Sequence, residues 1–308
     1  MRKEFAETLV EVAARDDRIA LLTGDLGFTV LEPFAERFPE RFFNVGVAEQ
    51  NMLGVATGLA EGGFRPYAYS IATFASMRPY EFFRNGAALH RLPVRVVGVG
   101  SGFDYGPNGA THYALEDVGL MRLQPEVTVV APADADQARA AVRATASLDR
   151  PIYLRLGKDS PVLPGLDGRF ELGRAALIGS GEDAAVVTLG SISVEAARAA
   201  ELLTEQGADA TLAVVSSMNP SPVDDLAELL SRVPLALTVE SHYRTGGLGS
   251  LVSELVAERG LECRVIRCGV SEMPSGRSGS SRWLYAESGL DAQALADTAV
   301  RALALAGR

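Results

Sequence analysis

Apolar runs alternate with helical patterns along the first 160 residues. Short stretches rich in β-branched residues, such as 94–99, are separated by segments in which apolar residues recur at helical spacing, such as Phe5, Leu9 and Val12. Continuous apolar runs are typical of strands buried on both faces of a parallel sheet. The alternation predicts an α/β domain with a doubly wound sheet over residues 1–160. The expected strands are 19–22, a short one through Val45 and Val47, 64–71, 94–99, 127–130 and, closing the sheet, 151–156.

A second alternating series follows residues 161–183, which are rich in proline and glycine and are predicted to be a linker. The pattern predicts a second doubly wound domain over residues 184–308. Its expected strands are 185–189, 211–215, 236–240 and 264–268, and its helices are expected to begin near Val194, Val223, Leu248 and Ala292.

Composition and charge narrow the class of protein. The 308 residues are 47% hydrophobic and 22% charged, as is usual for α/β proteins with sizeable cores. The formal net charge of −10 argues against a general nucleic-acid binder, which usually has a basic face. No apolar run approaches the ~20 residues that span a bilayer, and the start, Met1 to Phe5, lacks the apolar core of a signal peptide. We therefore expect a cytoplasmic protein that does not bind membranes.

Glu49 stands where the apolar stretch 42–48 ends and a helical pattern begins. An acidic side chain there can simply stabilise the helix N-terminus through the helix dipole, by roughly 0.3–1 kcal/mol. The sequence around Glu49 favours a more specific role. Residues 44–51 (Asn-Val-Gly-Val-Ala-Glu-Gln-Asn) and 58–67 (Gly-Leu-Ala-Glu-Gly-Gly-Phe-Arg-Pro-Tyr) closely resemble the pyrimidine-binding domain of transketolase-type enzymes, which depend on thiamine diphosphate.

The resemblance covers nearly the whole chain. It matches the pyrimidine-binding domain and the C-terminal domain, which form the second half of a full-length transketolase and a separate chain in split transketolases. In the family, the residue matching Glu49 contacts the aminopyrimidine ring and activates the cofactor, and the aromatic matching Phe74 stacks on that ring. The resemblance also places Asp25 near the cofactor. It places Met77 and Tyr80, at one-turn spacings after Phe74, on the pocket wall.

The resemblance implies a catalytic role for His112 as well. This residue ends the wording Asn-Gly-Ala-Thr-His (108–112), which matches the family histidine that faces the reacting end of the substrate. Its loop follows an expected buried strand, where α/β proteins place their sites. Glu49 has to hold or readily share a proton at neutral pH. Burial favours its protonated form and the helix N-terminus its charged form, and we expect burial to dominate.

The resemblance further implies where substrates bind, and the sequence departs from the family there. Arg2 and Thr29 match positions that hold the phosphate of sugar phosphates. Lys158 stands where the family usually has a phosphate-binding arginine, so a point charge replaces a bidentate fork. Gly100 replaces a further phosphate-binding histidine, and Asn108 replaces the aspartate that contacts an acceptor hydroxyl. These changes favour a different acceptor, such as a modified or unphosphorylated sugar; alternatively, split enzymes bind the same phosphates with other residues.

The sequence predicts no metal site on this chain. Residues 24–27 (Gly-Asp-Leu-Gly) with Asn51 only imitate the family's magnesium and diphosphate motif, because Leu26 replaces a required glycine. Cys263 and Cys268 lie in one strand-like stretch and are expected to be core thiols, not a zinc site. Magnesium and the diphosphate should therefore be held mainly by an N-terminal transketolase subunit. We expect an α2β2 heterotetramer that is inactive without this partner, and pairing of two copies of the chain through the helix after Glu49.

The function implied is that of one subunit of a thiamine-diphosphate-dependent transketolase, which transfers a two-carbon ketol unit between sugars or sugar phosphates. One alternative is the β subunit of a 2-oxo-acid dehydrogenase decarboxylase, whose usual wording after the activating glutamate differs from Gln50-Asn51. Another is an enzyme similar to 1-deoxyxylulose-5-phosphate synthase, which departs from transketolase mainly in domain order. A non-catalytic scaffold chain is a third, against which Glu49, Phe74 and His112 argue.

Overall fold

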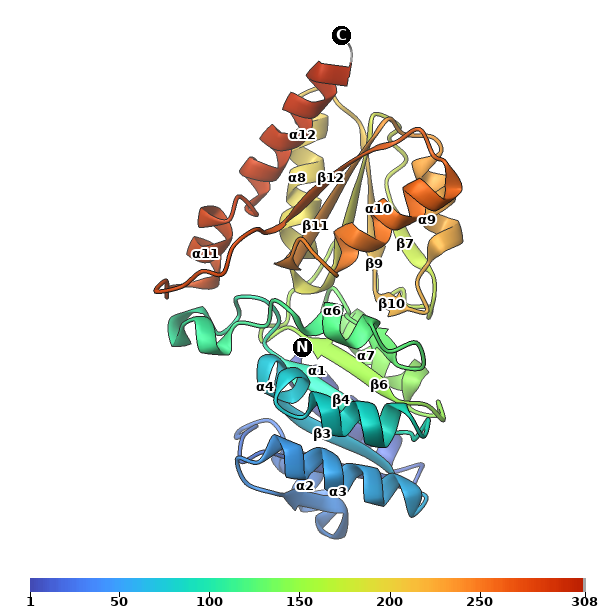
Figure 1. The fold of residues 1–308 in the computed structure, drawn as a ribbon, viewed down its shortest axis with the longest axis vertical. Coiled ribbons are helices and arrows are strands. Elements are labelled where there is room, and N and C mark those ends of the chain that lie inside the picture. Colours follow the sequence, from blue (N-terminus) through green and yellow to red (C-terminus); the bar gives the residue numbers. More distant parts are fainter. Residues whose placement is uncertain (307–308) are drawn as a thin grey trace.

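The computed structural model describes residues 1–306, which form two α/β domains stacked along the long axis of the molecule (Figure 1). In this described part, the first sheet has seven strands in the order β10-β5-β6-β4-β3-β1-β2. Strands β1 to β6 run parallel, whereas β10 pairs antiparallel with β5. The strands are β1 (Ile19–Thr23), β2 (Phe42–Asn44), β3 (Arg65–Ile71), β4 (Arg95–Val99), β5 (Thr128–Val130), β6 (Ile152–Leu156) and β10 (Ser217–Asn219).

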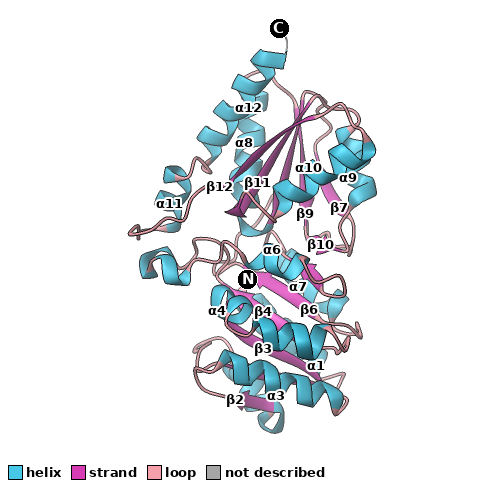
Figure 2. Ribbon diagram, viewed as in Figure 1, coloured by secondary structure: helices cyan, strands magenta, loops and turns pink. Residues whose placement is uncertain are grey.

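Helices cover both faces of this sheet (Figure 2). Successive strand residues point to opposite faces, so that Val96 packs in the cluster with α3 and Val97 in the cluster with α1. Helices α1, α2 and α7 share the face of Val97, whereas α3, α4, α6 and a π-helical turn (Phe83–Ala88) share the face of Val96. The helices are α1 (Arg2–Ala13), α2 (Glu32–Arg37), α3 (Glu49–Glu61), α4 (Ala72–Met77), α5 (Tyr80–Phe82), α6 (Asp117–Arg122) and α7 (Ala135–Thr145).

The second domain is built around a sheet that has five strands within residues 1–306, in the order β12-β11-β8-β9-β7. Its strands run parallel except β7, which is antiparallel to β9. Helices α8 and α12 pack in one apolar cluster, and α9 and α10 in another. The elements are β7 (Ala175–Ile178), β8 (Ala184–Leu189), α8 (Ser193–Glu205), β9 (Ala210–Val215), α9 (Val223–Leu230), β11 (Leu235–Tyr243), α10 (Leu248–Arg259), β12 (Arg264–Val270), α11 (Ser281–Glu287) and α12 (Ala292–Ala306).

The predicted fold class, two doubly wound α/β domains, is confirmed, and several details of the prediction are wrong. Strand β6 does not close the first sheet but lies between β4 and β5. The strand before Glu49 ends at Asn44 because Gly46 turns the chain with a φ of +74°, which leaves Val47 73% exposed. The segment 161–183 contains β7, which belongs to the second sheet, and residues 217–219 join the first sheet.

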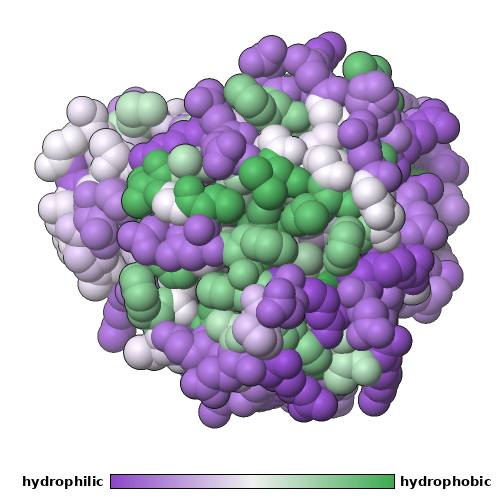
Figure 3. Space-filling model, turned by 90° about the horizontal axis from the view of Figure 1, so that it is seen from below, coloured by the Kyte–Doolittle hydropathy of each residue, from purple (hydrophilic) through white to green (hydrophobic). Residues whose placement is uncertain are grey.

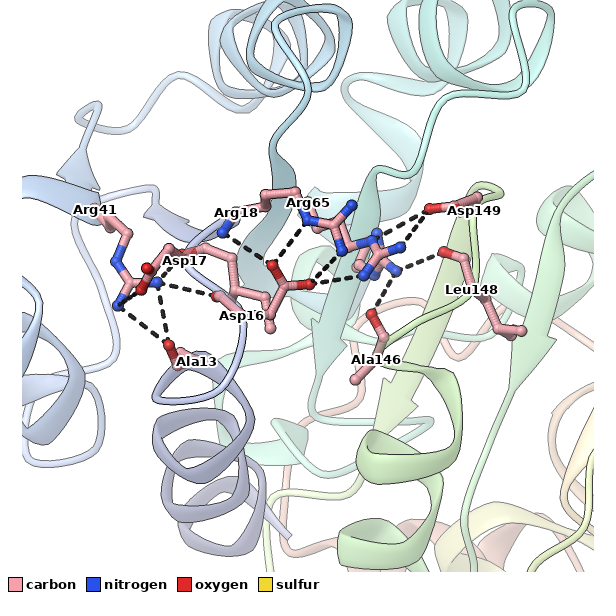
Figure 4. A network of polar contacts seen from close by, with 11 residues as sticks. Ala13, Asp16, Asp17, Arg18, Arg41, Arg65, Ala146, Leu148 and Asp149 are labelled. Carbon is pink, nitrogen blue, oxygen red and sulfur yellow. Dashed lines mark hydrogen bonds and ion pairs between the residues drawn. The ribbon is translucent and has the colours of Figure 1, made fainter.

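A network of ion pairs lies at the amino ends of the first sheet's strands (Figure 4). Arg65, the first residue of β3, pairs with Asp16 at 2.7 Å and with Asp149 at 2.7 Å. Hydrogen bonds from Arg18, together with Arg65, lower the pKa of Asp16 to about 2. Because the strands are parallel, this network occupies one edge of the sheet and leaves the carboxyl edge to the loops described below.

A buried ion pair of the first domain makes a hydrogen bond to the second domain. Asp117, the first residue of α6, accepts hydrogen bonds from Arg155 Nε at 2.7 Å and from the Tyr153 hydroxyl at 2.6 Å. Arg155 Nη2 also donates to the backbone oxygen of Ser241 in β11 at 2.9 Å. The pair therefore ties β6 of the first domain to the second domain.

Three further observations concern features predicted from composition. Among the described residues, no helix is both long enough and apolar enough to cross a bilayer. Cys263 and Cys268 are free thiols, and burial raises the pKa of each to about 11. Within residues 1–306, no cluster of His, Cys, Asp and Glu side chains is suited to hold a metal ion.

Candidate active site

Glu49 lies at the carboxyl edge of the first sheet, as the first residue of α3. Its side chain is 2% exposed. Oε1 accepts a hydrogen bond from the Ser70 hydroxyl at 3.0 Å, and Oε2 pairs with Arg78 Nη1 at 2.9 Å. The carboxylate is thus held by partners from the end of β3 and from the residue after α4. An open pocket of about 600 Å³ adjoins it, lined by Val47, Ala48, Glu49, Gln50, Asn51 and Arg78.

Phe74, on α4, is connected to this carboxylate through Arg78. The guanidinium carbon of Arg78 is 3.8 Å from the centroid of the Phe74 ring, which is the distance of a close cation–π stack. The imidazole of His112 approaches the same ring edge-on, with 5.0 Å between the centroids. Glu49, Phe74 and His112, predicted from three separate stretches of sequence, are therefore connected by a chain of contacts in which Arg78 lies between Glu49 and Phe74.

The loop after β4 continues the site. His112 ends a short 3₁₀ turn (Ala110–His112), and its Nδ1 lies 3.0 Å from the Thr111 hydroxyl. The ring of Tyr105 lies 6.5 Å from the His112 ring, and the Lys158 ammonium lies 5.1 Å from the Tyr105 centroid. Arg2 Nε donates to the backbone oxygen of Lys158 at 3.2 Å. These contacts form a row that leads from the buried carboxylate to two cations. Its members, in order, are Glu49, Arg78, Phe74, His112, Tyr105, Lys158 and Arg2.

The cationic end of the row is anchored by Asp104. The backbone N–H of Lys158 donates to Asp104 Oδ2 at 2.9 Å. Burial raises the pKa of Asp104, although the hydrogen bond from Lys158 opposes the shift. Asp104 fixes the backbone of Lys158 and leaves its ammonium to the Tyr105 ring.

Three predicted site residues lie outside this row. Asp25 is exposed, has a φ of +58° and accepts a hydrogen bond from Asn44 Nδ2 at 2.9 Å. Thr29 is exposed, with a φ of +65°, and its N–H donates to Glu32 at 2.8 Å. Asn108 is exposed at the end of a 3₁₀ turn (Gly106–Asn108). Their proposed contacts with cofactor or substrate remain predictions.

Met77 and Tyr80 were predicted to line the pyrimidine pocket. Met77 is 43% exposed. The Tyr80 hydroxyl donates to the backbone oxygen of Leu120 at 2.8 Å and accepts from Gln124 Nε2 at 2.7 Å. The polar end of Tyr80 is therefore committed to α6 and the residues after it, and only its ring is free to serve as a wall.

Sequence reasoning missed Ser70, Arg78 and Tyr105. Ser70 and Arg78 are the two side-chain partners of Glu49, and no motif in the sequence around either residue marks it as part of a site. Tyr105 is related to the substitution noted at Gly100, whose φ is +83°. A Cβ at Gly100 would lie 2.1 Å from the Tyr105 ring. Tyr105 thus fills the space over Gly100 and leaves no room there for the family's histidine.

Comparison with known proteins gives the family. The family model described as transketolase, pyrimidine binding domain, matches residues 1–161, and the one described as transketolase, C-terminal domain, matches residues 173–295. The chain belongs to the transketolase family. The family depends on thiamine diphosphate, and the resemblance stated from the sequence is confirmed.

The relatives of this transketolase-family chain include separate subunits. A putative transketolase C-terminal section of Methanocaldococcus jannaschii is 36% identical over 96% of this chain and 94% of its own length. One of the subunits of an apulose-4-phosphate transketolase of Phocaeicola vulgatus is 32% identical over 97% of this chain and 96% of its own length. A 1-deoxy-D-xylulose-5-phosphate synthase of Thermomicrobium roseum is 35% identical over 99% of this chain but only 49% of the synthase. A solved split-gene transketolase, described as an inactive β4 tetramer, superposes with a TM-score of 0.90 at 35% identity, covering 99% of this chain and 98% of that one.

Proposed function

We propose that this chain is the cofactor-activating subunit of a split, thiamine-diphosphate-dependent transketolase, which transfers a two-carbon ketol unit between sugars or sugar phosphates. The observation that carries the proposal is the placement of Glu49. A carboxylate that is 2% exposed is paired with an arginine that stacks on the Phe74 ring, and His112 contacts the same ring. A carboxylate that only stabilised a helix N-terminus would need none of these neighbours.

The residues of the site fit an aminopyrimidine ring. Arg78 already shows that a flat group with N–H donors can stack on Phe74 and bond to Glu49 at the same time. An aminopyrimidine is also flat, and its ring nitrogen donates an N–H to the carboxylate once it has taken the proton that it shares with Glu49. When bound, thiamine diphosphate supplies a carbon nucleophile that cleaves the bond next to a substrate carbonyl. Glu49 would hold and share a proton with the ring, Ser70 would fix its carboxylate, and Phe74 would orient the ring.

His112 would act on the substrate. It lies against Phe74 on the side that leads towards Lys158 and Arg2. A histidine there can hold or move a proton at a substrate oxygen near neutral pH. Its Nδ1 faces the Thr111 hydroxyl, which helps to fix the ring orientation.

A partner subunit would supply magnesium and hold the diphosphate, because the chain matches the pyrimidine-binding and C-terminal domains and its relatives include separate transketolase subunits. The end of the molecule formed by β2 and α3 carries an apolar patch (Figure 3), and Phe43, Val47 and Val55 on this part of the chain are exposed. A Cβ added to Gly54 or Gly58 of α3 would meet nothing within 4 Å. These features support a face that packs against other subunits, in an α2β2 assembly.

The acceptor site would lie at the cationic end of the row. Arg2 and Lys158 keep two positive charges there, while Tyr105 takes the space of the family's histidine. The relative from Phocaeicola vulgatus, named for apulose 4-phosphate, supports a specialised sugar phosphate as one candidate. An unphosphorylated or otherwise modified sugar is the other.

A 1-deoxyxylulose-5-phosphate-synthase-like activity is the second candidate, because the relative from Thermomicrobium roseum matches nearly the whole chain. The two activities differ in the donor. Release of CO₂ from a 2-oxo acid would support the synthase or the dehydrogenase β subunit, whereas turnover of a ketose donor without CO₂ supports transketolase.

Glu49→Gln tests the proposal. The substitution keeps the size of the side chain and removes the proton that Glu49 would share. With the partner subunit, thiamine diphosphate and Mg²⁺ present, we expect turnover to fall by about 10²–10⁴-fold, the usual contribution of acid–base assistance, with a smaller change in the cofactor Kd. Glu61→Gln is the matched control, because Glu61 is exposed at the other end of the same helix. Near-normal turnover of Glu49→Gln would contradict the proposed role of Glu49 in activating the cofactor.

A further inference from the structure

Arg78 makes the same two contacts that the proposed function gives to the cofactor's aminopyrimidine ring. It bonds to Glu49 Oε2 at 2.9 Å and stacks on Phe74 at 3.8 Å. We propose that, in the absence of the cofactor, the Arg78 side chain occupies the place of the ring on Glu49 and Phe74, and that it must move away when the cofactor binds. This inference rests on the proposed function of the site.

The two occupants exclude each other on geometric grounds. A separation of 3.8 Å between the guanidinium carbon and the ring centroid is van der Waals contact, so no second flat group fits between them. Arg78 Nη1 lies 2.9 Å from Oε2 of Glu49, so the guanidinium also fills the space through which a ring stacked on the same face of Phe74 would reach this oxygen. Binding of the cofactor ring therefore requires Arg78 to leave both contacts.

The side chain of Arg78 is free to move into solvent, whereas that of Glu49 is held in the interior. The Arg78 side chain is 46% exposed and lines the open pocket, while the Glu49 side chain is 2% exposed. Among the described residues, Glu49 is the one hydrogen-bond partner of the Arg78 guanidinium. By contrast, the buried Arg155 bonds to Asp117, Ala114 and Ser241. Ser70 keeps Glu49 in place when Arg78 moves.

The arrangement has two effects of opposite sign. In the absence of the cofactor, Arg78 compensates a buried carboxylate that would otherwise have only a hydroxyl partner, and so it stabilises the chain. When the cofactor binds, the lost ion pair and stack weaken its apparent affinity. For a partly exposed ion pair with one cation–π contact, that loss is about three- to tenfold in Kd. A merely structural arginine would not lower cofactor affinity.

The test compares Arg78→Met, Arg78→Lys and the control Arg84→Met. Arg84 is exposed on the π-helical turn and bonds to Asn85 at 2.7 Å, away from Glu49. Each variant is assembled with the partner subunit and Mg²⁺. The Kd of thiamine diphosphate is then measured by calorimetry, and the thermal unfolding of the cofactor-free assembly is recorded.

We expect Arg78→Met to bind thiamine diphosphate about three- to tenfold more tightly and to unfold at a lower temperature without it. Arg78→Lys keeps the charge but loses the planar stack, so its affinity should lie between those of Arg78→Met and the wild type. Arg84→Met should match the wild type in both measurements. Weaker or unchanged binding by Arg78→Met would overturn the proposal, since Arg78 would then contact the cofactor or take no part.

A second measurement uses only the wild-type chain, so it does not depend on whether a variant folds. The neutral probe 4-amino-5-hydroxymethyl-2-methylpyrimidine carries the ring without the diphosphate, and its binding to the wild-type chain can be followed by NMR. Added salt weakens the Arg78–Glu49 pair, so the probe should bind more tightly as the salt concentration rises. Binding that is independent of salt, or no binding, would overturn the proposal. Neither measurement involves turnover, so the Glu49→Gln experiment can fail or succeed independently.

Discussion

Replacing Asp117 by asparagine should strongly destabilise the chain, although Asp117 lies outside the row from Glu49 to Arg2. The side chains of Asp117 and Arg155 are 0% and 1% exposed. Burial alone would raise the pKa of Asp117, but Arg155, His242 and Tyr153 outweigh it, so that the pKa is lowered. The carboxylate therefore remains charged in the interior.

The magnitude follows from what asparagine can and cannot replace. Its amide oxygen can accept the two hydrogen bonds that Oδ2 now accepts from the Tyr153 hydroxyl and Arg155 Nε, but its NH₂ group would then face the Arg155 Nη2 donor, which now bonds to Oδ1 at 3.1 Å. The arginine charge would be left buried without a counter-charge. Breaking one partner of a buried pair in this way costs about 3–5 kcal/mol.

Urea unfolding of the chain measures this cost as a fall in the midpoint at an unchanged slope. Glu11→Gln is a control, because the Glu11–Arg143 pair is exposed and should contribute less than about 1 kcal/mol. The lowered pKa means that the contribution of Asp117 is complete above its ordinary pKa and is lost as the pH falls through the lower folded value. A loss below about 1 kcal/mol for Asp117→Asn at neutral pH would refute the reasoning.

Three further predictions follow from the fold and the site. Asp16→Asn should lower the free energy of unfolding by about 1–2 kcal/mol at pH 7. The pKa of Asp16 in the folded chain is lowered to about 2, so the difference between variant and wild type in thermal unfolding should shrink as the pH falls from about 4 to about 2. The chain without a partner should bind thiamine diphosphate weakly and show no ketol transfer, because the proposed site holds only the pyrimidine end of the cofactor; robust activity alone would contradict this. With the partner, Lys158→Met should raise KM at least about tenfold for ribose 5-phosphate but not for ribose; equal effects on both sugars would remove Lys158 from the phosphate site.

The sequence was informative wherever local pattern decides structure. The run 94–99 forms a strand because each of its apolar residues meets a covered face, and the predicted strands of the second domain are present for the same reason. The sequence around Glu49 and around His112 singled out two side chains that the fold connects through Arg78 and Phe74, and their proposed roles remain predictions. In these cases the information is contained in a few neighbouring residues.

Prediction was weaker where tertiary contacts decide. Val47 continues an apolar alternation, but the backbone turns at Gly46 and exposes it. Arg78 looks like an ordinary charged residue after a helix, and only the fold brings it to Glu49, where it supplies a positive charge that the sequence analysis left out. Tyr105 acquires its position over Gly100 because a positive φ folds the loop back on itself.

Strand β10 bears on how the polypeptide can be divided. The match to the pyrimidine-binding domain ends at residue 161, yet the strand that covers the edge of β5 comes from residues 217–219. A fragment cut at residue 161 would leave the backbone N–H and C=O groups of β5 at an open edge, where a second chain can pair with them and start aggregation. A cut between the two family matches, which cover residues 1–161 and 173–295, would therefore separate β5 from the strand that covers its edge.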